Sequence, residues 1–558
     1  MSFWNNISRI LVVVVLILVN LVGSYYFFRI DLTNDRKYSI AKETKEILRN
    51  IDDIIYFKIY LHGEIPLEYK KLEDETKYML HEFRAYSKYI EYEFIDPGSL
   101  QNEDYKISLQ EELYRKGIPP IPHRNYENSK IEEYFIFPGI LASYKSKEYS
   151  ISLVNQTLMH SPEKVIKESI ENLEYLLING IRNLTTKKKQ TIALINGHGE
   201  TTNHLIFSFK ELMSEHYNLV NIEIKEQITA LDDVDCIVIN NPKTMFTEKD
   251  KFIIDQFIMN GGKSLWIVDD NNAEMDSLET KNETIVLPSK DKNLNDLLFK
   301  YGVRINSNLI QDLQSSPIPI VTHYIDEKPQ WSLFPWVFFP VITPNNNNII
   351  TYNTNPIKTE FPSSIDTINN RTKKTIILQT SAYTKVRSLP TLINLESLKQ
   401  TPDETTFNHG SKNIAILLSG QFESVFKNRI SSTISNDPNI NFKDHIIENK
   451  MLIISDGSFL NNQFFQGSPL PLGFDKHTNT QYGNEEFILN VIDYLLGNEE
   501  FIKIRSKNIA IRLLDKAKVN LEKEYWQLFN IIIPIIILLF IGYLFFIIRK
   551  RTYNKSLK

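Results

Sequence analysis

Short apolar runs alternate with stretches of helix length in the middle of the chain. Four such runs, each of strand length, occur between residues 191 and 270, and Gly, Asn or Asp stands at nearly every junction. This alternation is typical of βαβ units around a parallel sheet that is buried on both faces. The same rhythm returns at residues 450–459, which precede a helix-length stretch at 485–496. The pattern therefore predicts an α/β fold for this part of the chain.

The segment before it, residues 31–186, shows a different order of elements. Its apolar and amphipathic runs predict the order β-α-β-α-β-β-α, with long helices at 67–86 and 162–184. This is the order of the thioredoxin core, so we expect a thioredoxin-like domain. The redox motif of that fold needs two cysteines two residues apart, and the segment has none. The domain is therefore expected to be a scaffold or a recognition surface, with a stiff proline-rich loop at 118–122.

Composition indicates the borders of the central domain. Three lysines at 187–189 mark its beginning, and we expect the domain to extend over residues 190–505. Between about 315 and 448 the chain is rich in Pro, Asn and Thr and loses the regular alternation. This change predicts a large insertion between elements of the central sheet. A polar helical run at 506–528 is expected to follow the domain as a juxtamembrane helix.

Two apolar runs without a charged residue, at 10–28 and 529–548, have the length that a helix needs to cross a bilayer. The first is long for a signal peptide and lacks a small-x-small cleavage site, so we expect residues 1–30 to be an uncleaved anchor and not a removed signal. Basic residues crowd the tail at 549–558, and Arg9 precedes the first run. The positive-inside rule then predicts a two-pass inner-membrane protein with both termini cytoplasmic and its body periplasmic.

Charge and cysteine content exclude several classes of function. The formal net charge of −5 over 558 residues gives no indication of nucleic-acid binding. Cys236 is the only cysteine, which excludes intramolecular disulfides and cysteine-based metal clusters. It lies near the start of a strand-like run, so we interpret it as a small buried side chain. A phosphate-binding loop, a Gly-x-Ser-x-Gly elbow and a His-Glu-x-x-His motif are absent, so the chain is not a recognisable ATPase.

Three loops, at residues 196–200, 269–271 and 456–458, are expected to leave parallel strands at one edge of the sheet. Ligands of α/β sheets bind outside the carboxyl ends of the strands, where the carboxylates and imidazole of these loops could contact them. The candidate ligand-binding residues are Gly197, His198, Gly199, Glu200, Asp269 and Asp456. The alternative is structural, because Gly permits positive φ and Asp caps helices in ordinary βα turns. We expect no catalytic residue, no bound metal and no cofactor.

A set of short motifs in a fixed order resembles one protein family. The motifs are 29–33 (Arg-Ile-Asp-Leu-Thr), 37–39 (Lys-Tyr-Ser), 95–97 (Ile-Asp-Pro), 137–139 (Phe-Pro-Gly), 171–175 (Glu-Asn-Leu-Glu-Tyr), 197–200 (Gly-His-Gly-Glu), 246–252 (Phe-Thr-Glu-Lys-Asp-Lys-Phe), 301–305 (Tyr-Gly-Val-Arg-Ile) and 334–336 (Phe-Pro-Trp). With the two apolar runs they resemble the gliding-motility-associated ABC transporter component of Bacteroidota, often called its substrate-binding protein (GldG). The resemblance extends over nearly the whole chain.

The resemblance implies an accessory subunit that works with a separate ATPase and a separate permease in the inner membrane. It also implies a central domain similar to the class I glutamine amidotransferase fold, a flavodoxin-like arrangement, but without the amidotransferase nucleophile. We therefore expect a non-enzymatic subunit of an ABC-type complex that contacts an envelope component or other motility proteins. The alternative is a periplasmic amidotransferase-like hydrolase or ligand sensor that uses His198, Glu200, Asp269 and Asp456.

Overall fold

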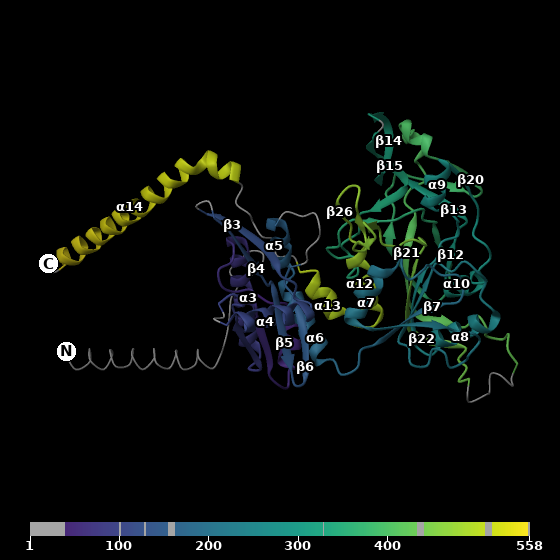
Figure 1. Cartoon of the computed structure of the whole chain (residues 1–558), viewed down its shortest axis with the longest axis horizontal. Coiled ribbons are helices and arrows are strands. Elements are labelled where there is room, and N and C mark those ends of the chain that lie inside the picture. Colours follow the sequence, from purple (N-terminus) through teal and green to yellow (C-terminus); the bar gives the residue numbers. More distant parts are fainter. Residues whose placement is uncertain are drawn as a thin grey trace. The chain divides into compact units, whose positions relative to one another are not determined.

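The computed structural model is a mixed α/β protein (Figure 1). It divides into two compact units: Met1–Lys37 with Ile509–Lys558, and Tyr38–Asn508. The residues that the structure describes are 39–99, 102–127, 130–154, 162–326, 328–431, 440–507 and 516–555. The second unit contains a four-stranded sheet and a seven-stranded sheet, together with smaller two- and three-stranded ones.

The four-stranded sheet has the order β2-β1-β5-β6. In that order its strands are Ile90–Phe94, Ile55–Ile59, Gly139–Tyr144 and Lys147–Ser152. β1 is parallel to β2 and antiparallel to β5, and β5 is antiparallel to β6. A parallel pair needs a crossover connection, which here is α3 (Leu67–Tyr86), with the bounds that the sequence predicts. Ile55, Phe57 and Ile59 alternate along β1 and are fully buried.

Further helices belong to this part of the chain: α2 (Lys42–Arg49), α4 (Glu103–Arg115), α5 (Pro162–Glu171) and α6 (Leu173–Thr185). The sequence predicts one helix at 162–184, but the chain divides at Asn172 into α5 and α6. The predicted loop at 118–122 is shorter than expected, because Ile121 begins β3 (Ile121–Glu127), which pairs with β4 (Lys130–Ile136). Pro122 is tolerated in β3 because both strands of a two-stranded ribbon are edge strands.

The seven-stranded sheet has the order β18-β21-β22-β10-β9-β7-β8. In that order its strands are Lys373–Gln379, Asn413–Glu423, His445–Ile454, Lys263–Ile267, Cys236–Asn240, Thr191–Asn196 and Asn218–Glu223. The five strands from β22 to β8 are parallel, as the alternation predicts. β21 is antiparallel to β22, and β18 is antiparallel to β21. The span 315–448 therefore supplies two strands to this sheet in addition to separate elements.

Helices cover both faces of this sheet: α7 (Phe207–His216), α8 (Glu248–Met259), α10 (Asn295–Tyr301) and α12 (Asn484–Leu495). Ile192 and Leu194 of β7 belong to one buried cluster with residues of α7 and α12. Ala193 and Ile195 belong to a second cluster with residues of α8 and α10. The chain runs from β7 to β8 on one side and then returns to β9 on the other, so the strand order reverses between β7 and β9. Such a reversal marks the usual ligand-binding position at the carboxyl edge of a sheet.

Smaller elements lie between the strands of this sheet along the chain. They pair β11 (Glu283–Val286) with β20 (Thr391–Asn394), β12 (Val303–Ile305) with β17 (Ile365–Thr367), β13 (Asn308–Asp312) with β19 (Thr384–Ser388), and β14 (Ser315–Ile325) with β15 (Lys328–Ile342) and β16 (Ile357–Lys358). β14 and β15 form the long hairpin at the top of Figure 1. At the base of that hairpin Trp336, Phe338 and Phe339 belong to a buried cluster of their own.

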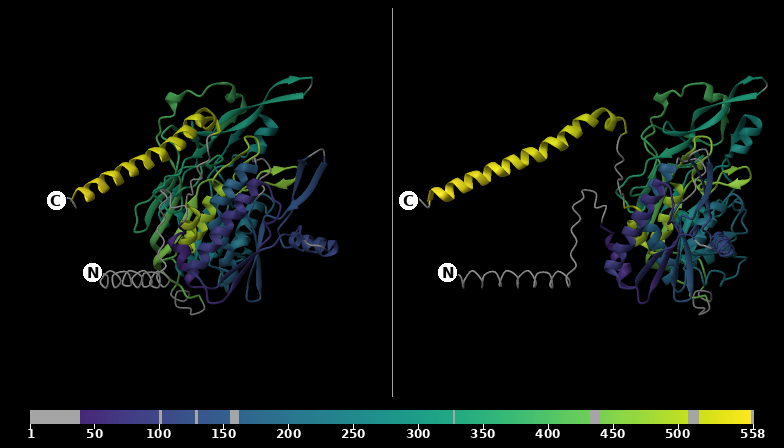
Figure 2. Two further views of the ribbon diagram at one scale, coloured as in Figure 1. Left: turned by 90° about the vertical axis from the view of Figure 1, so that its left-hand side faces the viewer. Right: turned by 60° about the vertical axis from the view of Figure 1, so that its left-hand side comes forward.

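The C-terminal helix α14 (Lys516–Lys555) is drawn from two further sides in Figure 2. Its segment Gln527–Lys550 contains an 18-residue window with a mean hydropathy of 3.2. Among the described residues, this is the one helical segment that is long and apolar enough to cross a membrane. The run predicted at 529–548 lies within this segment. The other predicted span, at 10–28, lies outside the described residues.

Candidate functional site

The loop after β7 is built on two glycines. Gly197 and Gly199 have φ angles of 109° and 72°, which only glycine adopts readily. Between them the His198 carbonyl oxygen accepts the backbone N–H groups of Lys243 and Thr244, both at 2.8 Å. These two bonds join the β7 loop to the loop after β9, the neighbouring strand. The glycines thus shape a turn that fastens two strand ends together.

The His198 side chain is enclosed by the loops around it. It is 6% exposed, and its ring stacks on Phe246 with the centroids 3.6 Å apart. Nε2 lies 3.3 Å from Asp250 Oδ2, and Nδ1 lies 3.3 Å from Glu200 Oε1. Burial by itself lowers the pKa of His198, but the Glu200 and Asp250 carboxylates outweigh burial and raise this pKa above its ordinary value. The protonated imidazole is thereby favoured as a link between two carboxylates.

Asp250 extends this cluster to the start of α8. Thr247 caps that helix, because its Oγ1 accepts the Asp250 N–H at 3.1 Å. Asp250 Oδ1 accepts the N–H of Glu226, which follows β8, at 2.8 Å. The His198 cluster therefore joins the loops after β7, β8 and β9 to one helix. Asp250 lies in the 246–252 motif, but the sequence does not indicate its contact with His198, which is 52 residues away along the chain.

Asp269 follows β10 and meets the loop after β22. Its Oδ2 accepts the Gly457 N–H at 3.0 Å, and its Oδ1 lies 3.7 Å from Lys292 Nζ. Lys292 is 8% exposed and donates to the carbonyl oxygen of Asp269 at 2.6 Å. Burial lowers the pKa of Lys292 and outweighs the opposing effect of the Asp269 carboxylate. A buried lysine that the sequence analysis does not identify therefore stands at the carboxyl edge of the sheet.

Asp456 is held by the turn that it begins. Its carboxylate accepts the Glu360 N–H at 2.8 Å, the Ser458 N–H at 3.0 Å and the Ser458 hydroxyl at 2.8 Å. The side chain is 1% exposed. Burial raises the pKa of Asp456 to about 7, although the hydrogen bonds act in the opposite direction. Asp456 thus ties the end of β22 to the chain around Glu360.

The candidate residues form two contact groups. His198 contacts Glu200 and Asp250, whereas Asp269 contacts the turn at Gly457. A Cβ added at Gly457 would lie 2.4 Å from Asn241 Nδ2 and 2.5 Å from Asp269 Oδ2, so the loops after β9, β10 and β22 approach closely at this glycine. Buried polar atoms without a hydrogen-bond partner among the described residues include Asn240 Oδ1 and Nδ2, Asn241 Oδ1 and Asp269 Oδ1. Buried atoms of this kind usually bond to water or a ligand.

The thiol of Cys236 lies far from this edge. Cys236 is the first residue of β9, and Asn240 is the last, so about 13 Å of strand separates the two ends. The side chain is fully buried, and burial raises the pKa of the thiol to about 12. A thiol in this state is not a nucleophile at neutral pH. Within the described ranges, no group of three or more His, Cys, Asp or Glu side chains is arranged to hold a metal ion.

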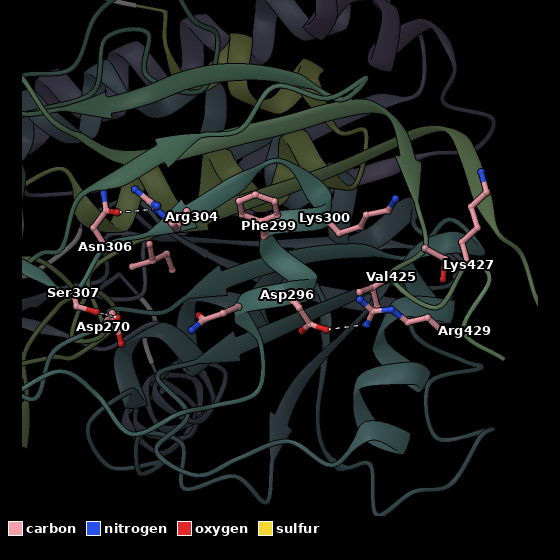
Figure 3. Close-up of a pocket in the computed structure, with 13 residues that line it drawn as sticks. Asp270, Asp296, Phe299, Lys300, Arg304, Asn306, Ser307, Val425, Lys427 and Arg429 are labelled. Carbon is pink, nitrogen blue, oxygen red and sulfur yellow. Dashed lines mark hydrogen bonds and ion pairs between the residues drawn. The ribbon is translucent and has the colours of Figure 1, made fainter.

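Two adjoining cavities open on the α10 side of this edge. The smaller, about 440 Å³, is lined in part by Asp269 and Lys292. The larger, about 790 Å³, is the one drawn in Figure 3. Residues that line both are Asp270, Asn295, Asp296, Ile305 and Ser307. The Ser307 hydroxyl donates to the Asp270 carboxylate at the junction, as the dashed line in Figure 3 marks.

Replacement of Asp456 by asparagine is expected to change how stability depends on pH. The folded-state pKa of Asp456, about 7, exceeds the ordinary value of 3.8, so its contribution to stability is complete below the ordinary value. That contribution is lost as pH rises toward 7, by at most about 1.4 kcal/mol per pH unit. The variant lacks this loss, so its stability relative to the parent chain should rise between pH 4.5 and 6.5 in urea unfolding. If the free energies of unfolding of the two proteins changed in parallel over this pH range, the raised pKa of Asp456 would be contradicted.

Two protein-family models match this chain, one over its central part and one over its N-terminal part. The model described as "ABC-type uncharacterized transport system" matches residues 189–491, and a model of a domain of unknown function matches residues 34–143. A Borreliella burgdorferi protein described as "Uncharacterized protein" is 24% identical over 559 residues, which are 98% of this chain and 98% of that protein.

Two solved structures give distant superpositions. The mmIFT52 N-terminal domain is 12% identical and matches 55% of this chain and 97% of its own, with a TM-score of 0.32. The exo-beta-1,4-mannosidase Op5Man5 from Opitutaceae bacterium strain TAV5 is 11% identical and matches 70% of this chain and 51% of its own, with a TM-score of 0.20. Neither superposition bears on fold or function. Because the transport-system model matches more than half of the sequence, the chain belongs to the family of ABC-type uncharacterized transport system proteins, which are auxiliary to the transporter.

Proposed function

We propose that this chain is a non-enzymatic accessory subunit, of the so-called substrate-binding kind, in an ABC-type transporter of the inner membrane. The observation that carries the proposal is that one chain joins a body of this family to the membrane-length segment Gln527–Lys550. That connection tethers the body at the membrane, where a permease resides. ATP hydrolysis then belongs to a separate subunit, because the sequence has no phosphate-binding loop.

Residues 31–186 form a thioredoxin-like domain in this proposal, and residues 190–505 form an amidotransferase-like domain. The order β2-β1-β5-β6 with a single parallel pair supports the first assignment. The parallel strands β8-β7-β9-β10-β22 follow the second, first, third, fourth, fifth order of flavodoxin-like sheets, which supports the second. Both domains would act as scaffold and recognition surface.

The proposal also includes a topology and a biological setting. The basic tail at 549–558 is cytoplasmic, the body is periplasmic, and the apolar run at 10–28 provides a second span. The partners are the ABC permease and ATPase, and an envelope component or other motility proteins. The link to gliding motility rests on the short sequence motifs alone, and a deletion strain of a gliding host that still glides would remove it.

The alternative, a periplasmic hydrolase or ligand sensor at the strand ends, has less support from the geometry. His198 stacks on Phe246 and pairs with two carboxylates, and Asp456 is saturated by hydrogen-bond donors of its own turn. A hydrolase needs a nucleophile within hydrogen-bond reach of a base. The thiol of Cys236 begins β9 and does not reach these residues. A ligand sensor, the other part of this alternative, is still supported by the polar atoms of Asn240 and Asp269 that lack a hydrogen-bond partner among the described residues.

Co-purification tests the accessory-subunit proposal. Affinity capture of the tagged full chain from native membranes in mild detergent should recover one permease and one ATPase in fixed proportion to the bait. A tagged membrane protein of similar abundance and span number is the control for detergent carry-over. Capture of neither transporter component, with the bait intact and folded, would overturn the proposal.

A further inference from the structure

The larger cavity beside α10, here named the α10 cleft, has the size of a small-molecule site. Its volume is about 790 Å³, and clefts that hold small ligands usually lie between about 300 and 1,000 Å³. Four segments form its walls: α10, the chain around β12, the loop after β21, and the loop after β10, which contributes Asp270. Figure 3 shows side chains from these segments along the cleft.

Four cationic side chains from these segments line the α10 cleft: Lys300, Arg304, Lys427 and Arg429. All four are partly exposed, so their charged groups are available to a ligand. In the view of Figure 3 the Phe299 ring lies between Arg304 and Lys300, and Lys427 and Arg429 lie at the far end of the cleft. An anionic group that enters the cleft would therefore meet a cation on either side of the aromatic ring.

The carboxylates that pair with these cations do not exhaust their hydrogen-bonding capacity. Glu423 is shared by Lys300 at 2.9 Å and Lys427 at 3.2 Å. Asp296 is shared by Arg429 at 3.2 Å and Lys251 at 3.1 Å. An ammonium has three donors and a guanidinium has five, so each cation retains donors for an added anion.

The cations hold the shared carboxylates in their charged form. Hydrogen bonds from Lys300 and Lys427 lower the pKa of Glu423 to about 2. Burial acts to raise the pKa of Asp296, but Lys251 and Arg429 outweigh it, and this pKa falls below its ordinary value. Asp296 in the wall of the cleft, and Glu423 just before the lining residue Ser424, are therefore stabilised in the charged form by the cations that pair with them.

The inner end of the cleft is polar and incompletely bonded. Asp270 and Ser307 connect it to the smaller cavity, which ends at Lys292 and Asp269. Lys292 is 8% exposed and makes one hydrogen bond that the structure describes, to the Asp269 carbonyl oxygen. Asp269 Oδ1 is buried without a hydrogen-bond partner among the described residues. A donor and an acceptor thus stand side by side, which suits a hydroxyl group because a hydroxyl both accepts and donates.

Phe299 adds an apolar platform to this polar site. Its side chain is 51% exposed although it lies within the wall of the cleft. We propose that the α10 cleft binds an acidic carbohydrate, with a sugar ring on Phe299, its hydroxyls on Asp270 and Asn306, and its carboxylate or phosphate on the cations. A neutral sugar would leave the cations unused, and a simple anion would leave the aromatic face unused. This inference does not depend on the transporter assignment.

Isothermal titration of the full chain in detergent tests this proposal with three probes. They are trigalacturonic acid, which carries carboxylates, glucose 6-phosphate, which carries a phosphate, and maltotriose, which is neutral. We expect at least one acidic probe to bind at least tenfold more tightly than maltotriose. Binding of one acidic probe alone would identify carboxylate or phosphate as the recognised group. Binding of neither acidic probe, or equal binding of maltotriose, would overturn the proposal.

Substitutions locate the binding in the cleft. Arg304→Gln and Phe299→Ala should each weaken the acidic probe about tenfold, the first by loss of charge and the second by loss of the platform. Lys249→Gln is the matched control, because Lys249 is also an exposed, paired cation, 2.8 Å from Glu226, but does not line the cleft. Each variant is first shown to keep the melting temperature of the parent chain, and Lys300→Gln replaces any variant that does not. Unchanged affinity in folded cleft variants would overturn the assignment.

Discussion

Asp493→Ala is expected to lower the free energy of unfolding by about 3–5 kcal/mol. Asp493 lies on α12 and is fully buried. Its carboxylate accepts Arg505 at 2.7 Å and Tyr217 at 2.5 Å, and Arg182 lies 3.3 Å from it. Removal of the carboxylate leaves two buried guanidinium groups without a counter-charge, and neither can lose its proton at neutral pH. The expected loss is therefore much larger than that of one hydrogen bond.

The measurement is urea unfolding of the full chain in detergent, followed by fluorescence of the buried Trp266 and Trp336. The control is Asp366→Ala, which removes an Arg–Asp pair of similar length, 2.9 Å, whose side chains are 60% and 51% exposed. Loss of an exposed pair should cost at most about 1 kcal/mol. Equal small losses in the two variants would show that Asp493 does not compensate the buried arginines.

The position of Asp493 also predicts how cooperatively the two sheets unfold. Arg182 comes from α6, beside the four-stranded sheet, whereas Asp493 comes from a helix on the seven-stranded sheet. The two residues are 311 positions apart in sequence. Because the pair links the two sheet systems through buried charges, we expect the four-stranded and seven-stranded parts to unfold in a single transition, which Asp493→Ala should split or broaden.

Local patterns predicted elements well where the signal was periodic and unbroken. α3 has the predicted bounds because its apolar positions recur with helical spacing over 20 residues. β9 was predictable because its first four residues, Cys236–Ile239, form a continuous apolar run that is buried. The membership of β18 and β21 in the main sheet was not readable. That membership depends on pairing between distant segments, such as Ala415 with Ile454, for which the local sequence carries no signal.

In the candidate site, too, features that depend on local sequence could be predicted, whereas contacts between distant segments could not. The glycine turn at Gly197 was recognisable, because its requirement for positive φ is local. Lys292 was not, because Lys290 and Lys292 occur in one polar run and only the folded chain buries the second. The partner of His198 was missed for a similar reason. Asp250 reads as an ordinary first-turn acidic residue of α8, and only the packing of the β7 loop brings it to the imidazole.

Glu174 joins the two ends of the larger compact unit, Tyr38–Asn508. The Glu174 carboxylate on α6 accepts the Ala41 N–H and the Thr44 hydroxyl, both at 2.6 Å. Its other oxygen pairs with Lys507 Nζ at 2.6 Å, and that ammonium also donates to the carbonyl oxygen of Ser39 at 2.6 Å. One carboxylate, 2% exposed, therefore joins the first and last described residues of the body.

Glu174→Ala is expected to destabilise this junction by about 2–4 kcal/mol, since it leaves a buried hydroxyl, a backbone N–H and an ammonium without their acceptor. The effect should be local, because α2 contributes only Thr44 and Leu48 as fully buried residues and can detach before the sheets unfold. Hydrogen exchange in α2 should then accelerate by a factor of about 30 or more, while exchange in β7 and β9 stays at the parent rate.

The design of this experiment separates the carboxylate from the general loss of a glutamate. Glu46→Ala is the control, because Glu46 forms an exposed pair with Lys42 at 3.7 Å on the same helix and should leave exchange in α2 unchanged. Glu174→Gln should give an intermediate acceleration, since the amide oxygen still accepts one bond but the charge that holds Lys507 is gone. If Glu174→Ala left α2 as protected as in the parent chain, the carboxylate would not be what fastens this helix to α6. The packing of the fully buried Leu48 would then have to hold α2 in place.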